Sequence, residues 1–429
     1  MKYTLACFAA SRYWKDRAEL EKVFSEVSQH LPVPDEGMHL IVDGAGIDLL
    51  AGDGEKTLVI LPMSGAVQAD ILRAAKGFGA TVLYAAYVSG NAAKHSTDLM
   101  MAHNAAPTLM DCWSVLRKTH GRPLLALNST QLLKEIRLLE AYQAMQGRTI
   151  LLIGETEPWV ISVSRDYAVY ERLNIHIKQV SQKEVEDLYA LTSNKEAAAL
   201  YDRYAGGAES IAEPTEKDVR NAARMATALL KMMQEYRADA LAIACFNLLS
   251  LGTTSCLGVS FINTYTDKVA ACEGDLDSAL TMLMLRRLAK TSLWMANPAL
   301  HPDGLVNFSH CTAPLSAGGA TSCPYVLRSH HESGIGASLE VDLPKNAELT
   351  ACRVSAMWGT FTAHKAVSLP GKKEQGCRTQ LYVRFNNVDE YLATALGCHQ
   401  IFCFEDVRDD FARLAQWMGL KPESGKETC

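Results

Sequence analysis

The 429-residue chain has no apolar stretch long enough to cross a bilayer, so no membrane-spanning segment is expected. It also lacks a clustered Lys/Arg stripe. With a net charge of −6, this argues against a nucleic-acid partner. The start, Met1–Lys22, has one early lysine and a short apolar run that charges follow at once, which predicts a first β-strand and not a signal peptide.

The twelve cysteines form no CxxC pair and no regular framework, and many lie in apolar runs. This usage is typical of a reduced, cytoplasmic protein, in which a lone cysteine is usually a small core residue. Residues 1–148 also lack a GxGxxG or Walker motif, so a nucleotide cofactor is unsupported.

What the chain does contain is an ordinary globular composition, with 48% hydrophobic and 21% charged residues, and enough length for two or three domains. Residues 1–148 alternate short apolar runs with amphipathic ones, which predicts βαβ units and a parallel sheet. The strand candidates are Thr4–Phe8, Leu40–Val42, Thr57–Pro62, Thr81–Tyr87 and Pro123–Leu127, and the helix candidates are Lys15–His30, Ala66–Phe78, Thr108–Thr119 and Ser129–Met145.

Residues 149–300 predict a second α/β domain. Its clearest helix is Thr215–Arg237, where Thr215 and Asp218 resemble a capping box. The other candidates are the strands Thr149–Glu155, Asn174–Val180, Ala240–Phe246 and Gly258–Ile262, and the helices Gln182–Leu191, Lys195–Tyr204 and Leu276–Leu288.

The sequence pattern changes in residues 301–429. Short alternating runs separated by Gly, Pro and Lys-Asn turns predict antiparallel β structure there. The fold class expected is therefore α/β, with two Rossmann-like α/β domains followed by a C-terminal antiparallel, barrel-like β domain that ends in a helix.

The segment Ala270–Leu280 (AACEGDLDSAL) stands between a predicted strand and a predicted helix. Glu273 would lie at the sheet edge where open α/β folds bind ligands, and the helix N-terminus favours an ionised carboxylate there. Glu273 suits a divalent metal or a substrate proton. The alternative is a capped helix start, and for Asp275 the cap is the favoured interpretation.

Several histidines are candidates without a local zinc motif, namely His310, His330, His331 and His399. A strand-edge histidine is usually a hydrogen-bonded structural residue. A site of Glu273 with two distant histidines would have to be assembled by the fold, and such a set suits Mn²⁺, Fe²⁺ or Zn²⁺ better than Ca²⁺.

The C-terminal half resembles the L-fucose isomerase and L-arabinose isomerase superfamily of metal-dependent aldose–ketose isomerases, over roughly residues 240–420. The matching motifs, in unbroken order, are Ala271–Asp275 (ACEGD), Met295–Pro298 (MANP), His310–Leu315 (HCTAPL), Ser329–Gly336 (SHHESGIG), Gly376–Gln380 (GCRTQ) and Gly397–His399 (GCH) before Glu405-Asp406. The N-terminal part agrees with this superfamily only in its alternation of predicted strands and helices.

The resemblance implies roles for individual residues. Glu273 matches the metal-binding and catalytic glutamate, His399 matches the C-terminal histidine ligand, and His310 resembles an additional histidine ligand. His330, Glu332 and Arg378 lie in the matching motifs as substrate-binding candidates, and a structural role is the alternative, favoured for Arg378.

Asn297 stands where fucose isomerases have a second acidic ligand. An amide oxygen can bind a metal, but an amide cannot take up a proton. Glu273 could carry the proton alone while Asn297 binds the metal, Asp275 could be recruited, or the chain could run a different reaction or bind sugars without turnover.

The resemblance thus implies a cytoplasmic, metal-dependent aldose–ketose isomerase of a free sugar, with Mn²⁺ or a related ion and a homo-oligomer whose subunits share active sites. The catalytic residues would be Glu273 and Asn297, and the metal ligands Glu273, Asn297, His310 and His399. The alternative is a sugar-binding or altered-chemistry carbohydrate protein on the same scaffold, and a repressor is disfavoured because neither end shows a helix-turn-helix.

Overall fold

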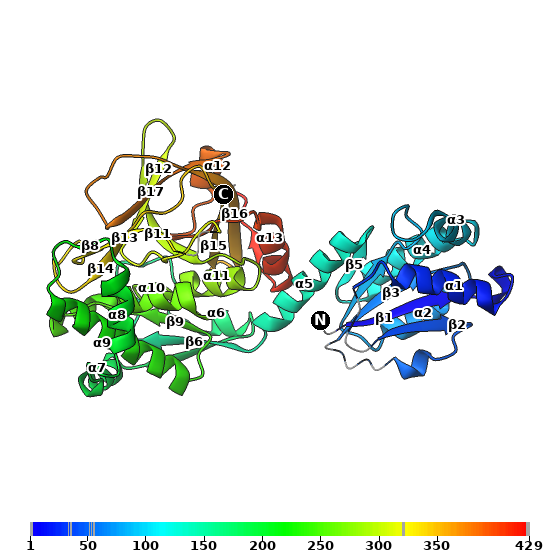
Figure 1. The fold of residues 1–429 in the computed structure, drawn as a ribbon, viewed down its shortest axis with the longest axis horizontal. Coiled ribbons are helices and arrows are strands. Elements are labelled where there is room, and N and C mark those ends of the chain that lie inside the picture. Colours follow the sequence, from blue (N-terminus) through cyan, green and yellow to red (C-terminus); the bar gives the residue numbers. More distant parts are fainter. Residues whose placement is uncertain are drawn as a thin grey trace. The chain divides into compact units, whose positions relative to one another are not determined.

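The computed structural model describes residues 3–425 apart from 33, 35, 36, 51, 53, 55, 320 and 321. The chain divides into two compact units, Met1–Gln143 and Ala144–Cys429 (Figure 1). No helix among the described residues combines the length and the apolar character needed to cross a bilayer.

The first unit contains a parallel sheet with the strand order β2-β1-β3-β4-β5. Buried side chains of α2 and α4 pack on one face of this sheet against β1 and β3. The strands are β1 (Tyr3–Ala9), β2 (Met38–Val42), β3 (Thr57–Pro62), β4 (Ala80–Tyr84) and β5 (Pro123–Ala126), and the helices are α1 (Arg17–Ser28), α2 (Gln68–Ala75), α3 (Lys94–Ala102), α4 (Ala105–Thr119) and α5 (Ser129–Met145). All five strands and four helices predicted here are confirmed, and α3 is an addition.

The second unit begins with another parallel sheet, in the order β10-β9-β6-β7. In both sheets the first strand in the chain lies between the second and the third, which is the order of doubly wound α/β folds. The strands are β6 (Arg148–Ile153), β7 (Ile175–Val180), β9 (Ala240–Ile243) and β10 (Val269–Ala271), and the helices are α6 (Ala168–Glu171), α7 (Gln182–Leu191), α8 (Ala198–Gly207), α9 (Glu216–Glu235), α10 (Cys256–Tyr265) and α11 (Leu276–Arg286). The capping box predicted for α9 is confirmed, since Thr215 and Asp218 bond reciprocally.

The segment Gly258–Ile262 was predicted as a strand, and this prediction is wrong, because it lies inside α10. Seven of the ten residues of α10 are buried, so apolar residues are not confined to one stripe and the sequence carries no clear helical period. Gly258 lies against α9, where a Cβ would stand 3.0 Å from the Cα of Ala226 and would push the two helices apart. The strand that leads to Glu273 is β10 instead.

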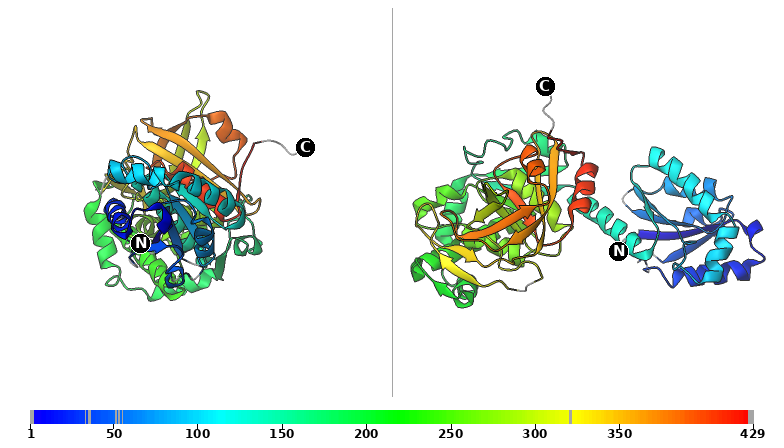
Figure 2. Two further views of the ribbon diagram at one scale, coloured as in Figure 1. Left: turned by 90° about the vertical axis from the view of Figure 1, so that its right-hand side faces the viewer. Right: turned by 90° about the horizontal axis from the view of Figure 1, so that it is seen from above.

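The rest of the second unit is built on a closed antiparallel barrel of six strands, in the order β15-β18-β11-β12-β17-β16 with β16 pairing back to β15 (Figure 2). In its core the Phe402 ring lies tilted against Trp294 and edge-on to Phe308. The strands are β11 (Leu293–Leu300), β12 (Val306–His310), β15 (Glu348–Ser355), β16 (Thr360–Leu369), β17 (Thr379–Phe385) and β18 (Gln400–Cys403). The antiparallel β structure predicted after residue 300 is present, and β11 precedes the 300/301 boundary drawn from the sequence.

Smaller elements complete this unit. A three-stranded sheet in the order β14-β13-β8 lies beside the barrel, and β19 pairs with β16. These elements are β8 (Ser210–Ile211), β13 (Tyr325–Arg328), β14 (Ser338–Val341) and β19 (Lys421–Pro422), with helices α12 (Val388–Ala393) and α13 (Arg408–Trp417). The parallel sheet and the barrel belong to one compact unit.

Candidate metal centre

The turn between β10 and α11 holds Glu273 in a left-handed backbone conformation, with φ of 59°, followed by Gly274 with φ of 60°. A non-glycine residue pays strain in this region, so it persists only where the surroundings fix it. The Glu157 N–H donates to the carbonyl of Glu273 at 3.0 Å, and the Gly274 N–H donates to that of Ile243 at 2.8 Å. A Cβ on Gly274 would lie 2.6 Å from the Glu155 carbonyl oxygen, so glycine is required.

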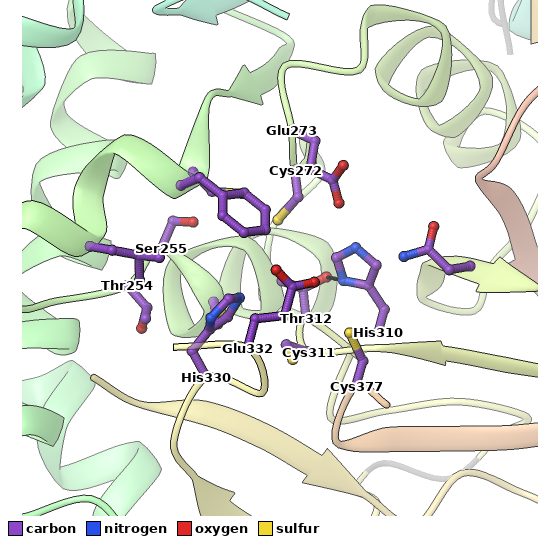
Figure 3. A pocket seen from close by; sticks show the side chains of 15 residues that line it. Thr254, Ser255, Cys272, Glu273, His310, Cys311, Thr312, His330, Glu332 and Cys377 are labelled. Carbon is purple, nitrogen blue, oxygen red and sulfur yellow. Dashed lines mark hydrogen bonds between the residues drawn. The ribbon is translucent and has the colours of Figure 1, made fainter. Parts of the chain in front are cut away.

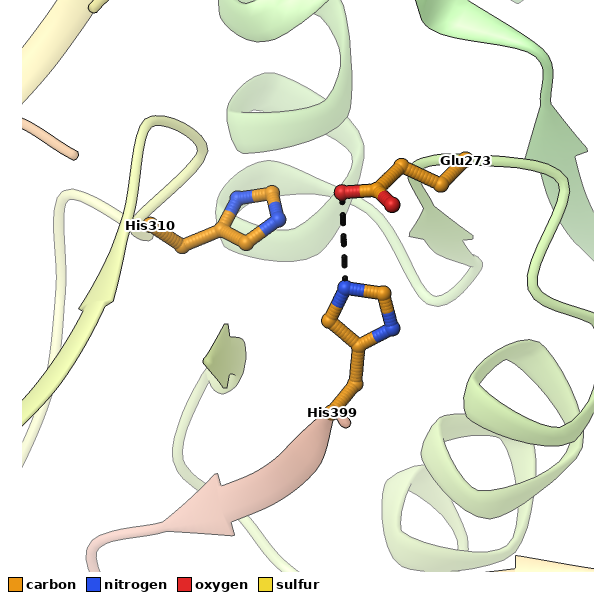
Figure 4. Close-up of side chains that lie close together, drawn as sticks. All are labelled: Glu273, His310 and His399. Atoms are coloured by element: carbon orange, nitrogen blue, oxygen red, sulfur yellow. Dashed lines mark ion pairs between the residues drawn. The ribbon is translucent and has the colours of Figure 1, made fainter. Parts of the chain in front are cut away.

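Glu273 converges with His310, the last residue of β12, and His399, which directly precedes β18 (Figure 4). One potential ligand atom from each of the three lies within 4.8 Å of the others. Within the part of the chain that the structure describes, this is the one group of three or more His, Cys, Asp or Glu side chains with such spacing. The fold therefore brings together the carboxylate and both histidines that the sequence analysis named as metal ligands.

The two oxygens of the Glu273 carboxylate have different partners. Oε2 accepts a hydrogen bond from Nε1 of Trp159 at 2.8 Å, whereas Oε1 lies 3.4 Å from Nε2 of His399. Burial raises the pKa of Glu273, but the bond and charge of His399 outweigh it, so this pKa is below its usual value. Glu273 is thus ionised, with one oxygen anchored and the other facing the histidines.

His399 is fully buried and held from one side only. Its Nδ1 donates to Oδ2 of Asp275 at 2.7 Å, while its Nε2 is buried without any hydrogen-bond partner. Histidine ligands of metals typically donate through the second nitrogen to a carboxylate in this way. Burial lowers the pKa of His399, but the bond to Asp275 and the neighbouring side chains of Cys398 and Glu273 raise it well above its usual value overall. The orphaned Nε2 beside a carboxylate fits a cation bound between the two.

His310 supplies a neutral imidazole. The ring is 5% exposed, and its Nδ1 shares a 2.8 Å hydrogen bond with Oγ1 of Thr312. Burial, together with repulsion from His399, lowers the pKa of His310 to about 4. An uncharged ring near neutral pH is the form that binds a metal.

Asp275 performs two tasks at once. It caps α11 by accepting the Ser278 N–H at 2.7 Å, which confirms the predicted cap, and it also holds His399. Arg353 of β15 faces Asp275 with contacts of 2.9 and 3.2 Å, and both side chains are fully buried. Although burial opposes ionisation, Arg353 and His399 keep the pKa of Asp275 far below its usual value. Capping therefore does not compete with a role in the site.

Asp277, two residues further along the chain, is a second buried carboxyl group. Its Oδ1 accepts from the Tyr170 hydroxyl at 2.8 Å, and its Oδ2 has no partner. Burial raises the pKa of Asp277 to about 6, with the negative charge of Asp275 adding to the effect and Arg353 opposing it. Asp277 bonds to Tyr170 and to the Ala356 N–H, not to a metal-ligand candidate, and belongs to the support of α11.

A cavity opens beside the ligand group, and it is lined by Glu273, Asn297, His310, His330 and Glu332 among others (Figure 3). Asn297 projects from β11 opposite Ser309 of β12 in the barrel wall. The His330 ring stands edge-on to Phe246 at 5.6 Å. Two of the three residues named as substrate-binding candidates, His330 and Glu332, thus line the same cavity as Glu273, Asn297 and His310.

Arg378 is the exception among these candidates, because it is not part of this cavity's lining. Its guanidinium donates to the carbonyl of Ser329 at 2.9 Å and to the Ser329 hydroxyl at 3.0 Å, and lies 3.9 Å from Glu213. These contacts anchor the residue before His330 and correspond to the structural alternative.

Two contributors to the site, Trp159 and Glu157, were not predicted from the sequence. Trp159 donates to Glu273 and packs edge-on against Phe246, with ring centroids 5.0 Å apart. The buried carboxylate of Glu157 accepts the Phe246 N–H at 3.4 Å, and its pKa is raised by burial and by the charge of Glu273. No local pattern marks Trp159 or Glu157, because both follow β6 and meet Glu273 only when the sheet forms.

Five cysteines also line the cavity, namely Cys245, Cys256, Cys272, Cys311 and Cys377. A hydrogen bond from Cys377 lowers the pKa of Cys311 to about 7, and backbone N–H groups of Arg378 and His331 contribute. All cysteines among the described residues have free thiols.

The chain matches no protein-family model, and no curated protein matches it either.

Proposed function

We propose that this chain is a divalent-metal aldose–ketose isomerase of a free sugar, of the kind that its motifs resemble. The observation that carries the proposal is the convergence of Glu273, His310 and His399, which come from three separate motifs, within 4.8 Å of one another. A chance resemblance of short motifs would not be expected to bring these three residues together, with Glu273 and His310 lining a cavity that Asn297 also lines.

The donor set fits a borderline divalent ion, and we propose Mn²⁺. One carboxylate, two imidazoles and the amide oxygen of Asn297 suit Mn²⁺, Fe²⁺ or Zn²⁺. When bound, such an ion polarises neighbouring sugar oxygens and stabilises the charge of an enediol. The buried Nε2 of His399, without a hydrogen-bond partner, supports a cation at this place.

Glu273 is proposed to move the proton between C1 and C2 of the sugar. Its Oε2 is oriented by Trp159, which limits rotation of the carboxylate. Asn297 cannot accept the proton. Asp275 is a poor substitute, because Arg353, Ser278 and His399 already occupy its buried oxygens. Proton transfer by Glu273 alone is therefore the favoured form of the mechanism.

Several finer features belong to this proposal. The two parallel sheets are taken as Rossmann-like domains, since both have the doubly wound strand order. We further propose a cytoplasmic homo-oligomer in which N-terminal residues of a neighbouring subunit complete the pocket.

A second function, sugar binding or altered chemistry on the same metal site, is favoured by one specific observation. Asn297 replaces an acidic residue, so the cavity lacks a second lining carboxylate in β11. Calorimetric binding of sugars with and without EDTA separates a metal-independent binder from a protein that holds its ligand through the ion.

The deciding experiment is metal removal and return. The purified protein is analysed for bound metal, stripped, and supplied with Mn²⁺ together with pentoses, 6-deoxyhexoses and anionic sugars. We expect ketose formation that disappears on stripping and returns with Mn²⁺. Tight metal binding without any isomerised sugar would favour the second function, and a failure to bind metal would overturn both.

A further inference from the structure

The isomerisation proposed for this chain requires two proton transfers, and Glu273 accounts for only one of them. Conversion of an open-chain aldose to a ketose moves one proton from C2 to C1 and a second proton from O2 to O1. Glu273 is assigned the carbon-bound proton. Asn297 stands where fucose isomerases have a second acidic residue, and its amide cannot take up a proton. The oxygen-bound proton therefore requires another group of the cavity.

The cavity has a second carboxylate in its wall, that of Glu332. Glu273 and Glu332 are the two acidic residues of its lining. In the close-up view, Glu273 extends into the cavity from above and Glu332 from below (Figure 3). Glu332 is exposed although it lines the cavity, so it lies at the opening. No residue that the structure describes forms a hydrogen bond or an ion pair with its carboxylate.

Glu332 belongs to a tight turn between β13 and β14. The His330 N–H donates to the Ile335 carbonyl at 3.0 Å, and the Gly334 N–H donates to the His330 carbonyl at 2.9 Å. Inside the turn, the Ser333 hydroxyl bonds to Nδ1 of His330 at 3.1 Å and accepts the Ile335 N–H at 3.2 Å. These bonds close the turn on itself, so the backbone that carries Glu332 is held in one conformation.

The residue at the base of this turn, Ser329, is held by three side chains. Its N–H donates to Oε2 of Glu213 at 3.1 Å. Its carbonyl accepts from Nε of Arg378 and from the hydroxyl of Ser338, both at 2.9 Å. Arg378 also donates to the Ser329 hydroxyl at 3.0 Å. Arg378 lies outside the cavity lining, and its contribution to the site is therefore to fix the start of the turn that carries Glu332.

The other end of the turn is fixed to the cavity wall. A Cβ on Gly336 would lie 2.8 Å from Cγ2 of Thr254, so the turn approaches this wall as closely as glycine permits. The Thr254 hydroxyl donates to the Ala337 carbonyl, and Thr254 itself lines the cavity. A side chain held at a site by supporting hydrogen bonds, with its own polar atoms unoccupied, is prepared to bind what enters. Glu332 meets this description.

We propose that Glu332 is the second proton-transfer residue of the site and that it carries the oxygen-bound proton, an inference that rests on the proposed isomerase function. Glu273 takes the proton from C2 and returns it to C1. The Glu332 carboxylate accepts the proton of the O2 hydroxyl and returns it to O1. The C2–H and O2–H bonds break, the C1–H and O1–H bonds form, and the carbonyl moves from C1 to C2. The sugar is rearranged without an added oxidant or reductant.

His330 is the neighbouring candidate for this transfer and is the less suitable one. Its Nδ1 is engaged with the Ser333 hydroxyl, and its ring stands edge-on to Phe246 at 5.6 Å. These contacts make the imidazole a support of the turn. The Glu332 carboxylate, two residues further along the same turn, has both oxygens available to the substrate.

The two protons are distinguished by running the reaction in D₂O. Metal-loaded wild type and Glu332→Gln are given pentoses, 6-deoxyhexoses and anionic sugars, and NMR follows both ketose formation and deuterium at C2 of the recovered aldose. In the variant we expect ketose formation to fall by about 10²–10⁴-fold. Exchange at C2 should fall much less, because Glu273 still removes that proton. Bound metal, and calorimetric binding of the alditol that corresponds to the substrate, should stay at the wild-type level.

His331→Gln is the matched control, because His331 belongs to the same turn but not to the cavity lining, and it should keep the wild-type rate. Glu332→Asp, which retains a carboxylate, should recover part of the rate. A wild-type rate in Glu332→Gln, or equal losses of ketose formation and C2 exchange, would overturn the role of Glu332 and leave the isomerase function standing. Neither ketose nor C2 exchange with any sugar in the wild type would overturn the isomerase function and this role together.

Discussion

Nδ1 of His399 donates to Oδ2 of Asp275 at 2.7 Å, and this leaves Nε2 pointing at Glu273. The bond joins the barrel to the start of α11, so it fixes both the tautomer and the direction of the ring. Most of the following expectations depend on this arrangement.

Removing the charge of Glu273 should abolish metal binding. In Glu273→Gln the Trp159 N–H can still donate to the amide oxygen, but the anionic ligand is lost. We expect the variant to lose bound metal and any metal-dependent turnover while keeping its fold, measured by metal analysis and circular dichroism. Trp159→Phe, which retains Glu273, is the control and should keep its metal. Turnover at a near wild-type rate in Glu273→Gln would refute the assigned role.

Asp275→Asn should weaken metal binding without removing a ligand. Asparagine still caps α11, but it holds the imidazole less strongly, and loss of such supporting bonds typically costs about 10–100-fold in metal affinity. Metal titration of the variant against Asp277→Asn measures the effect, since Asp277 has no bond to His399. Equal affinities in the two variants would contradict the supporting role of Asp275.

Metal affinity should fall with decreasing pH by about tenfold per unit near neutrality. The pKa of His399 is raised in the metal-free protein, so below that pKa one proton must leave Nε2 for each ion bound. His310, with a pKa of about 4, is already neutral there and adds a second proton only near that pH. Calorimetry between pH 6 and 7.5 in buffers of different ionisation enthalpy should report close to one released proton, and release of two would contradict the neutral state of His310.

The buried cation of Arg353 should be essential for folding. Its loss would remove the guanidinium that pairs with Asp275 and offsets the charge of Asp277, leaving His399 as the remaining cation at Asp275, and breaking a buried pair costs about 3–5 kcal/mol. We expect Arg353→Met to show this loss in denaturant unfolding. Lys365→Ala, which breaks the more exposed pair with Asp406, should cost less than about 1 kcal/mol.

The Asp277→Asn variant should gain folding stability relative to wild type as the pH rises. The folded pKa of about 6 lies above the usual value, so the ionised form is penalised increasingly from about pH 4 to pH 6 and fully above it. Relative to wild type, the free energy of unfolding of the variant should improve by up to about 3 kcal/mol between pH 4 and pH 8. A pH-independent difference would show that Asp277 does not carry the shifted pKa.

The sequence was most informative where local rules decide the structure. Thr215 with Asp218, and Asp275 before α11, are caps whose partners lie three residues away, so they could be recognised without the fold. The strands of the first unit could be recognised equally well, because fully buried parallel strands are short apolar runs between helices.

Local sequence patterns did not predict the structure where burial removed the polar–apolar periodicity of a helix, or where interacting residues lie far apart in the sequence. The largely buried α10 was predicted as a strand, and β11, which positions Asn297, was not recognised. Glu273 was singled out by its place between a predicted strand and a predicted helix, whereas the choice of His310 and His399 among the histidines came from the resemblance of their motifs. Arg353 and Trp159, which hold these residues in place, were not predicted. Each reaches the site from a strand or loop whose sequence shows no recognisable motif.

The ligand residues come from two different layers of the second unit. Glu273 belongs to the edge of the parallel sheet, whereas His310 and His399 belong to the barrel. A fragment that ends before β11 would contain Glu273 but neither His310 nor His399. The complementary fragment would contain both histidines but not Glu273. An ion bound by all three residues would therefore link the two layers, and its binding free energy would stabilise their packing against each other.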